Sequence, residues 1–322
     1  MQRRFLPFVL LVLVLGALFT ACGTSPGSQT TNCPSMTAQD AYNKPIKFSC
    51  TAPKRIITLI ASESEIVAAL GLDDRVVAVD AYTDYPADLT SKTKISSASQ
   101  GYSTEQIIAL KPDLVLSDGA ITAKDPITQE PIDSTLTNAG INLVDLPAAH
   151  TIEDVLRNIN IVGALTLTQD KAQQVVKGLQ QRIDTVKNKV TGAPSHPTVY
   201  MELDYSTPGS PYTFGPGSFG DDLMQKAGGT NIFGNLTAGG AFPQVTDEAV
   251  IQANPQVIIL TEDPSFGGDP SQVAKRNGWS VIAAVQQQRI YDLGPDLTSH
   301  SSPRLIDGLE ALAKDLYPSL FG

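Results

Sequence analysis

Histidine is scarce in this sequence, which has three in 322 residues, at His150, His196 and His300. They lie in separate segments, and none has a Cys, Asp or Glu neighbour at the spacing of a metal site. No nucleophile–base pattern stands out either. The sequence therefore predicts no metal, no catalytic group and no resident cofactor, and we expect a protein that is not an enzyme. His196 is expected in a linker and His150 before a helix, whereas His300 falls in a polar loop after a strand.

Positive charge is also in short supply. Lys and Arg number 23 against 33 Asp and Glu, so the net charge is -10. An acidic chain is repelled by nucleic acid and by an anionic membrane surface, which argues against both as partners. Hydrophobic residues make up 42% of the chain, which is enough to build the cores of about two domains.

The cysteines are Cys22, Cys33 and Cys50. Residues 1–21 combine a basic start, an apolar run over residues 5–19 and small residues before Cys22, which is typical of a signal peptide. A cysteine directly after it resembles the lipobox of bacterial lipoproteins, where that residue is lipidated; an incidental cysteine is the alternative. Residues 22–44 then read as a flexible tether that anchors the protein at the extracytoplasmic face of the membrane. In an exported protein, Cys33 and Cys50 are expected to form a disulfide, the alternative being two free thiols.

A short module occurs twice, at residues 104–117 and 247–261. Glu105 aligns with Glu248, and Pro112 aligns with Pro255. In each copy an amphipathic helix stops at a proline, which lacks the amide that would continue it. An apolar strand follows, as expected of a strand covered on both faces. Two similar α/β halves would leave a cleft between them, and such clefts bind ligands; chance similarity of short apolar segments is the alternative.

Strands alternate with helices over residues 45–167, which predicts an α/β lobe with a parallel sheet. Ser62 is expected to cap a helix over residues 62–70, with Glu65 at the capping-box position, and Thr151 with Asp154 to cap a helix over residues 152–165. Residues 168–191 contain no proline and carry apolar residues at helical spacing, which predicts one long connecting helix. The alternation resumes over residues 192–322 and predicts a second α/β lobe, with a helix near residues 273–279.

The segment GPGSFG at residues 215–220 matches a dinucleotide-binding fingerprint. That fingerprint requires a tight strand-to-helix turn, whereas the preceding strand, over residues 199–203, ends well before it. A loop that leads into a helix over residues 219–227 is the favoured interpretation, and a dinucleotide-dependent enzyme is a remote alternative.

Six segments together carry a family resemblance. They are PKRIITL at 53–59, SESEIVAALGL at 62–72, KPDLVL at 111–116, GSFGDDLMQKAGGTNIF at 217–233, PQVTDEAVIQANPQVIIL at 243–260 and SPRLIDGLEALAKDLYP at 302–318. In order and spacing the chain resembles the substrate-binding lipoproteins of ABC importers, in the cobalamin, haem and iron-siderophore group of periplasmic-binding proteins. The resemblance implies two Rossmann-like α/β lobes with parallel sheets, joined by a single long α-helix. It also implies a monomer that holds a small molecule between its lobes and delivers it to the permease subunits of an importer.

Ligands of parallel α/β folds bind at the carboxyl ends of the strands, and the loops expected there nominate ligand contacts. The candidates are Ser62, Glu63, Tyr82, Tyr85, Gly101, Tyr102, Asp118, Tyr205, Tyr212, Phe214, Phe242, Asp263, Phe266 and His300. The aromatic members would offer flat apolar contact to a large macrocycle. Alternatively, they cover the ends of the sheets, and His300 is a solvated loop residue. Trp279 is expected to pack rather than bind.

Two acidic residues are candidates for contact with the permease. In the family that the chain resembles, an exposed acid at the head of a helix in each lobe meets arginines of the permease. Glu65 and Asp222 match these positions, although Asp222 replaces the longer Glu. The alternative is that both acids only interact favourably with helix N-termini.

Cobalamin is the expected ligand, because the PQVT and SPRL segments most resemble cobalamin-binding members. The candidate loops also hold few cations, mainly Lys124, Lys275 and Arg276, and a trianionic ferric siderophore would need more positive charge. Against this, Ser99 stands where cobalamin binders often have Trp, so haem and ferric siderophores remain alternatives. A free-metal carrier is disfavoured by the scattered histidines.

Overall fold

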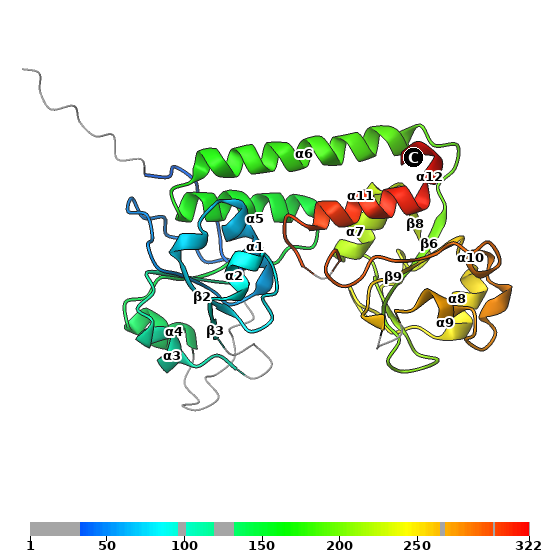
Figure 1. Ribbon diagram of the computed structural model, residues 1–322, viewed down its shortest axis with the longest axis horizontal. Coiled ribbons are helices and arrows are strands. Elements are labelled where there is room, and N and C mark those ends of the chain that lie inside the picture. The colour runs from blue at the N-terminus through cyan, green and yellow to red at the C-terminus, as the bar shows by residue number, and fades with distance from the viewer. Residues whose placement is uncertain (1–32, 96–100, 119–131, 265–267, 299, 322) are drawn as a thin grey trace, which may run out of the picture. The chain divides into compact units, whose positions relative to one another are not determined.

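The computed structural model describes residues 33–95, 101–118, 132–264, 268–298 and 300–321. Cys33–Gly322 forms one compact unit, organised around two β-sheets (Figure 1). We call the sheet of strands β1 to β5 with helices α1 to α5 the first lobe. The sheet of strands β6 to β10 with helices α7 to α12 is the second lobe.

The first lobe is a parallel α/β structure with strand order β3-β2-β1-β4-β5. Its strands are β1 (Ile56–Thr58), β2 (Val76–Asp80), β3 (Thr93–Ile95), β4 (Leu114–Ser117) and β5 (Leu143–Asp145). Its helices are α1 (Ala61–Ala69), α2 (Ala87–Thr90), α3 (Thr104–Ala109), α4 (Ile132–Asn138) and α5 (Ile152–Leu165). The predicted capping box at the start of α5 is present, because Thr151 and Asp154 exchange side-chain and backbone hydrogen bonds.

The long connecting helix is α6 (Gln169–Thr191), which contains 23 residues. It packs along α5 of the first lobe and along α11 (Leu305–Leu316) of the second (Figure 1). Apolar residues recur at helical spacing on one face and are buried, while the other positions are largely polar. The sequence pattern therefore places α6 where the prediction expected it.

The second lobe is a mixed sheet rather than the purely parallel one that the resemblance implied. Its strands are β6 (Thr198–Asp204), β7 (Tyr212–Thr213), β8 (Thr230–Asn231), β9 (Val257–Leu260) and β10 (Ile290–Asp292). Strand β7 pairs antiparallel with β6, because the chain returns directly after the loop over residues 205–211. Strands β8, β9 and β10 pair in parallel, as a crossover connection requires. The remaining helices are α7 (Phe219–Lys226), α8 (Asp247–Ala253), α9 (Pro270–Val273), α10 (Ala283–Gln286) and α12 (Pro318–Phe321).

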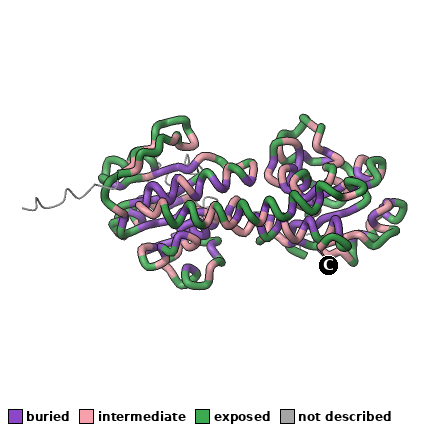
Figure 2. Tube along the Cα trace, turned by 90° about the horizontal axis from the view of Figure 1, so that it is seen from above, coloured by how far each residue is buried: buried purple, intermediate pink, exposed green. Residues whose placement is uncertain are grey.

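The apolar core has three parts. One cluster belongs to the first lobe alone and contains Ile57, Tyr102 and Ile107, and another belongs to the second lobe and contains Tyr200 and Trp279. The third and largest cluster runs without interruption from the first sheet through α1, α5, α6, α7 and α11 to the second sheet. Figure 2 shows the buried residues gathered in the strands and on the inner sides of the helices. The layer of helices is therefore a core that both lobes share.

Two local predictions are wrong. Helix α1 begins one residue earlier than expected, its N-cap is Ile60, and Ser62 makes no cap. The helix expected near residues 273–279 is instead the short α9 followed by a 3-10 turn, Trp279–Val281. Gly278 precedes that turn at φ 78, a left-handed conformation that glycine adopts at little cost and that helices do not contain.

Near the start of the described chain, Cys33 and Cys50 are joined by a disulfide. The segment that it closes also pairs with the first lobe, since the Ala41 amide donates to the Asp145 carbonyl at 3.0 Å. Within the described residues, none of the helices combines the length and the apolar character needed to cross a bilayer.

Candidate functional site

The first lobe gathers polar and aromatic residues at the carboxyl edge of its parallel sheet. Strand β2 ends at Asp80, whose carboxylate accepts the Tyr82 amide at 2.7 Å. Strand β1 leads into α1, where the Ser64 hydroxyl lies 2.6 Å from the Thr58 hydroxyl and 3.2 Å from that of Thr83. These bonds fix the start of the loop over residues 81–86. Tyr82 on that loop is 66% exposed.

Glu63 lies beneath this edge and is almost completely buried. Burial raises the pKa of its carboxyl well above the usual range, and the nearby charges of Asp118, Asp145 and Asp80 raise it further. Its Oε2 atom has no hydrogen-bond partner among the described residues. A neutral carboxylic acid is the form that such surroundings stabilise. Glu63 therefore does not reach the surface where the prediction placed a ligand contact, whereas Ser62 is partly exposed.

Two predicted aromatic contacts are core residues instead. Tyr102 is fully buried, and its hydroxyl donates to the Leu59 carbonyl at 2.6 Å. Phe214 is fully buried as well and packs edge-on against Phe219 and Phe242. Both rings fill the space next to a sheet, where apolar burial favours them. The alternative noted for these residues, that they cover the sheets, is the correct one.

The remaining candidates divide into exposed, partly buried and undescribed residues. Tyr85, Asp118, Tyr212, Phe242 and Asp263 are exposed, and Gly101, Tyr205 and His300 are partly buried. Tyr205 donates its hydroxyl to Asp247 at 2.9 Å. The predicted lipidation site Cys22, the predicted contact Phe266 and the cation Lys124 lie outside the described residues.

The second lobe contains a buried charged network that the sequence analysis missed. Both carboxylate oxygens of Glu202, on β6, accept hydrogen bonds from the Arg276 guanidinium at 2.7 Å. The Tyr200 hydroxyl donates to Glu202 at 3.0 Å, and Arg276 lies 3.5 Å from the centre of the Tyr205 ring. The only sequence signal for this site is an acid inside an otherwise apolar strand. Arg276, one of the few cations expected in the candidate loops, is thus already paired with Glu202.

Glu262 follows β9 and lies against the same network. Burial, the charge of Glu202 and a hydrogen bond to Glu202 raise the pKa of Glu262 to about 9. The Glu262 carboxyl is therefore neutral at pH 7 and can donate a hydrogen bond to Glu202. Trp279 packs edge-on against Tyr200 and Tyr205 in the core beside this network, which agrees with the packing role expected for it.

The prediction that Glu65 is exposed is wrong, because the side chain is 2% exposed and its carboxylate is fully engaged. It accepts hydrogen bonds from Arg304 at 2.7 and 3.0 Å and from the Ser302 hydroxyl at 2.5 Å. The Nδ1 atom of His300 lies 3.0 Å away. Burial alone would raise the pKa of Glu65, but the hydrogen bonds from His300, Arg304 and Ser302 outweigh it and lower the pKa. Glu65 thus joins α1 of the first lobe to the segment before α11 of the second.

Asp222 has the corresponding position in the second lobe and is not free either. Its Oδ2 atom accepts the backbone amide of Ile152, the first residue of α5 in the first lobe, at 2.9 Å. Its Oδ1 atom pairs with Lys226 at 2.6 Å, and Lys226 also pairs with Glu153 at 2.9 Å. A carboxylate at a helix N-terminus satisfies an amide that has no partner within the helix. Each of the two acids therefore bonds to the opposite lobe.

The glycine-rich segment at residues 215–220 has a packing role. A Cβ atom on Gly220 would lie 2.3 Å from the Phe214 ring, and one on Gly215 would lie 2.6 Å from the Gly240 carbonyl oxygen. The Ser218 side chain accepts the Asp221 amide and so caps α7. Close packing accounts for these glycines, in agreement with the favoured interpretation of a loop leading into a helix.

The other two histidines lie away from these edges. His196 contacts the Gly228 carbonyl at 2.8 Å through Nδ1, and His150 donates its backbone amide to Asp154 at 3.0 Å. In the part of the chain that the structure describes, no three His, Cys, Asp or Glu residues are arranged to hold a metal ion.

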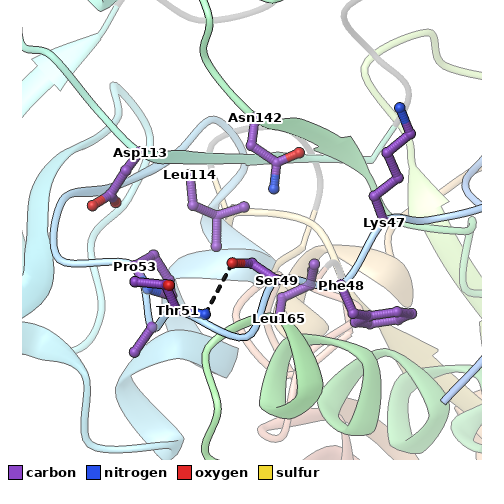
Figure 3. Close-up of a pocket in the computed structure, with 10 residues that line it drawn as sticks. Lys47, Phe48, Ser49, Thr51, Pro53, Asp113, Leu114, Asn142 and Leu165 are labelled. Atoms are coloured by element: carbon purple, nitrogen blue, oxygen red, sulfur yellow. Dashed lines mark hydrogen bonds between the residues drawn. The ribbon is translucent and has the colours of Figure 1, made fainter. Parts of the chain in front are cut away.

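A hollow with a volume of about 330 Å³ lies at the opposite end of the first sheet, and its lining residues are drawn in Figure 3. It lies beside Asp113 and Asn142, which precede β4 and β5, and contains none of the predicted ligand contacts. Asp113 accepts the amides of Lys54 and Arg55 at 2.8 Å each. The residues around this hollow thus connect the start of the first lobe to its sheet, and the hollow is not part of the carboxyl edge.

Comparison with known proteins shows the family to which this chain belongs. The periplasmic binding protein family model matches residues 56–297. An ABC transporter substrate-binding lipoprotein of Bacillus subtilis, YvrC, is 31% identical over 318 residues, which cover 96% of each chain. The vitamin B12-binding protein of Vibrio cholerae is 27% identical over 259 residues, covering 80% of this chain and 87% of that protein. Among solved structures, a periplasmic solute-binding protein of Staphylococcus epidermidis has 29% identity and a TM-score of 0.71, covering 83% of this chain and 100% of its own. The chain therefore belongs to the periplasmic binding protein family.

Proposed function

We propose that this protein is the extracytoplasmic solute-binding component of an ABC importer and that its ligand is a corrinoid such as cobalamin. In this role it captures the ligand between its lobes, performs no reaction, and passes the ligand to the permease. Similarity to a substrate-binding lipoprotein along nearly the whole chain supports the transport role. A lipid anchor on Cys22 would keep the protein at the outer face of the cell membrane.

The observation that carries the ligand class is the charge at the strand ends. The charges of Asp80 and Asp118 lie at the edge of the first sheet, whereas the carboxyls of Glu63 and Glu262 are buried near the two edges and are held neutral, so they supply no positive charge there either. The described arginine near the second edge is already bonded to Glu202. A polyanionic ligand would meet repulsion and few available cations at such a site. An electrically neutral ligand rich in amide groups suits it better.

Exposed aromatic side chains support a ligand with a large flat face. Tyr82 and Tyr85 are exposed in the first lobe, and Tyr212 and Phe242 are exposed in the second. Aromatic rings bind such faces with much apolar contact and little loss of conformational entropy. A corrin ring with amide side chains combines the flat face and the neutral polar rim that these residues would recognise.

Titration of the purified protein with cyanocobalamin, haemin and ferric ferrioxamine, followed by absorbance and calorimetry, tests the proposal. We expect saturable binding of cyanocobalamin at one site. Tyr82→Ala should weaken it by about tenfold, equivalent to about 1.4 kcal/mol. Tyr42→Ala, at another exposed tyrosine, is the matched control and should leave affinity unchanged. Binding of haemin or the ferric chelate alone would overturn the corrinoid assignment, and binding of none of the three would count against the capture role.

A further inference from the structure

Arg304 makes contacts that extend beyond its ion pair. It lies directly before α11 in the second lobe, and its guanidinium forms two hydrogen bonds to Glu65 on α1 of the first lobe. The same guanidinium lies 4.4 Å from the centre of the Tyr85 ring and 3.8 Å from the Asp84 carboxylate. One side chain of the second lobe thus contacts both a helix and the strand-end loop of the first.

The pair between Arg304 and Glu65 is well fixed. The Ser302 hydroxyl donates to the same carboxylate at 2.5 Å and also accepts the Arg304 amide at 3.3 Å. The Glu65 side chain is 2% exposed and that of Arg304 is 14% exposed. A planar guanidinium held at two points by a buried carboxylate has little freedom to turn. The face that it presents to Tyr85 is therefore set by the Glu65 pair.

The loop over residues 81–86 is held from two sides. At its start, Asp80 accepts the Tyr82 amide, and Thr83 bonds to Ser64, both within the first lobe. At its end, Asp84 and Tyr85 rest against Arg304 of the second lobe. Tyr82, which the proposed function places against the ligand, is part of the first attachment and directly precedes the residues that contact Arg304. A shift of the guanidinium would release the second attachment and leave the first to hold the loop alone.

We propose that Arg304 is a positioning residue for ligand capture, which sets the conformation of the loop that carries Tyr82 through its contacts with Glu65 and Tyr85. This inference rests on the proposed function for its effect on the ligand. Arg304 touches no ligand itself. It links the loop at the mouth of the first lobe to the second lobe, so that the ligand-facing tyrosine is set by a side chain from the other half of the molecule.

Arg304→Lys is the test variant, because lysine keeps the charge and a single bond to Glu65 but loses the planar fork and its face toward Tyr85. Arg182→Lys is the matched control. Arg182 bonds to Glu310 at 2.6 and 2.8 Å and to Asp307 at 2.5 Å. These hydrogen bonds join α6 to α11, and although Arg182 lines the same hollow as Tyr85 and Pro86, none of them involves the 81–86 loop. Both variants lose the paired hydrogen bonds of a guanidinium to a carboxylate, but only Arg304→Lys is expected to affect the loop.

Hydrogen exchange of the ligand-free protein provides the first readout. In Arg304→Lys, the amides of Tyr82 and Thr83, which are bonded to Asp80, should exchange about tenfold faster than in the wild type, as loss of a guanidinium–ring contact implies. Amides of β1 and β4 should be unchanged, and Arg182→Lys should leave the loop unchanged. Equal exchange of the loop in both variants, or faster exchange throughout the first lobe, would overturn the positioning role.

Cyanocobalamin affinity provides the second readout. Arg304→Lys should weaken binding by about tenfold, whereas Arg182→Lys should not, even where the two lower the melting temperature equally. Tyr85→Leu, which removes the ring but keeps the ion pair, should reproduce the faster loop exchange in the ligand-free protein, a readout that loss of a direct ligand contact would not change. If the wild type does not bind cyanocobalamin, the corrinoid assignment fails, while the exchange comparison still decides the role of Arg304. Normal affinity in both Arg304→Lys and Tyr85→Leu would refute the proposed effect on capture.

Discussion

Replacement of Glu262 by glutamine should stabilise the protein, and the gain should grow with pH. The folded protein holds the Glu262 carboxyl neutral up to a pKa of about 9, compared with an ordinary value of 4.5. Between those values the folded state binds a proton that the unfolded chain has released, so stability falls as the pH rises. Glutamine has nearly the same shape, remains neutral, and can still donate a hydrogen bond to Glu202.

The size of the gain in stability follows from the difference between the working pH and the ordinary pKa of Glu262. Neutral pH lies about 2.5 units above the ordinary pKa, and each unit corresponds to about 1.4 kcal/mol, so the cost at pH 7 approaches about 3 kcal/mol. Glu262→Gln should therefore raise the free energy of unfolding by up to about 3 kcal/mol at pH 7 and by little near pH 5.

Urea denaturation at pH 5, 6, 7 and 8 measures this difference directly. Glu248→Gln, at an exposed acid on α8, is the control, since it removes the same charge without changing a buried site. A gain in stability that is the same at every pH, or that grows toward acid, would refute the assignment of a buried neutral carboxyl at Glu262.

Three further results are expected. Glu65→Ala should cost about 3 kcal/mol of stability at pH 7, because it removes the buried carboxylate that binds the Arg304 guanidinium, and calorimetry should show the deficit shrinking as the pH falls below the ordinary value of 4.5. Serine in place of both Cys33 and Cys50 should lower stability by about 3 kcal/mol; a thiol assay that found both cysteines free in unreduced, denatured wild-type protein would contradict the disulfide. Cys22→Ala should release the protein from membranes in a fractionation assay, and its retention after normal signal cleavage would argue against a lipid anchor.

Local patterns predicted those parts of the fold that depend on local forces. The long helix α6 follows from apolar spacing alone, and its observed bounds differ by about one residue from the prediction. The repeated modules likewise appear as α3 followed by β4 and as α8 followed by β9. In both cases a proline stops the helix, and the apolar run that follows enters a buried strand. Such signals lie within a few residues of the structure that they specify.

The errors at the candidate site have the opposite origin. The exposure of Glu65 depends on Arg304, which is 239 positions away in the sequence, and that of Asp222 depends on Ile152, 70 positions away. The local sequence around an acidic residue near a helix start is the same whether its side chain faces solvent or another lobe. Tyr102 and Phe214 show the same difficulty, because an aromatic residue in a loop is equally compatible with a core and with a ligand surface. These assignments required the tertiary contacts.

The layer of helices that both lobes share explains why Glu65 and Asp222 bond to the opposite lobe. A single apolar cluster continues from one sheet to the other through α5, α6 and α11, so parting the lobes at this layer would expose core side chains to water. Glu65 and Asp222 lie on this layer, and each bonds to the lobe opposite its own. Apolar contacts oppose separation of the two lobes but allow one lobe to slide along the other, whereas paired hydrogen bonds hold the lobes in one relative position. The hydrogen bonds of the two acids thus define the relative position of the lobes more closely than hydrophobic burial alone would, and the strand-end loops are positioned from that fixed layer.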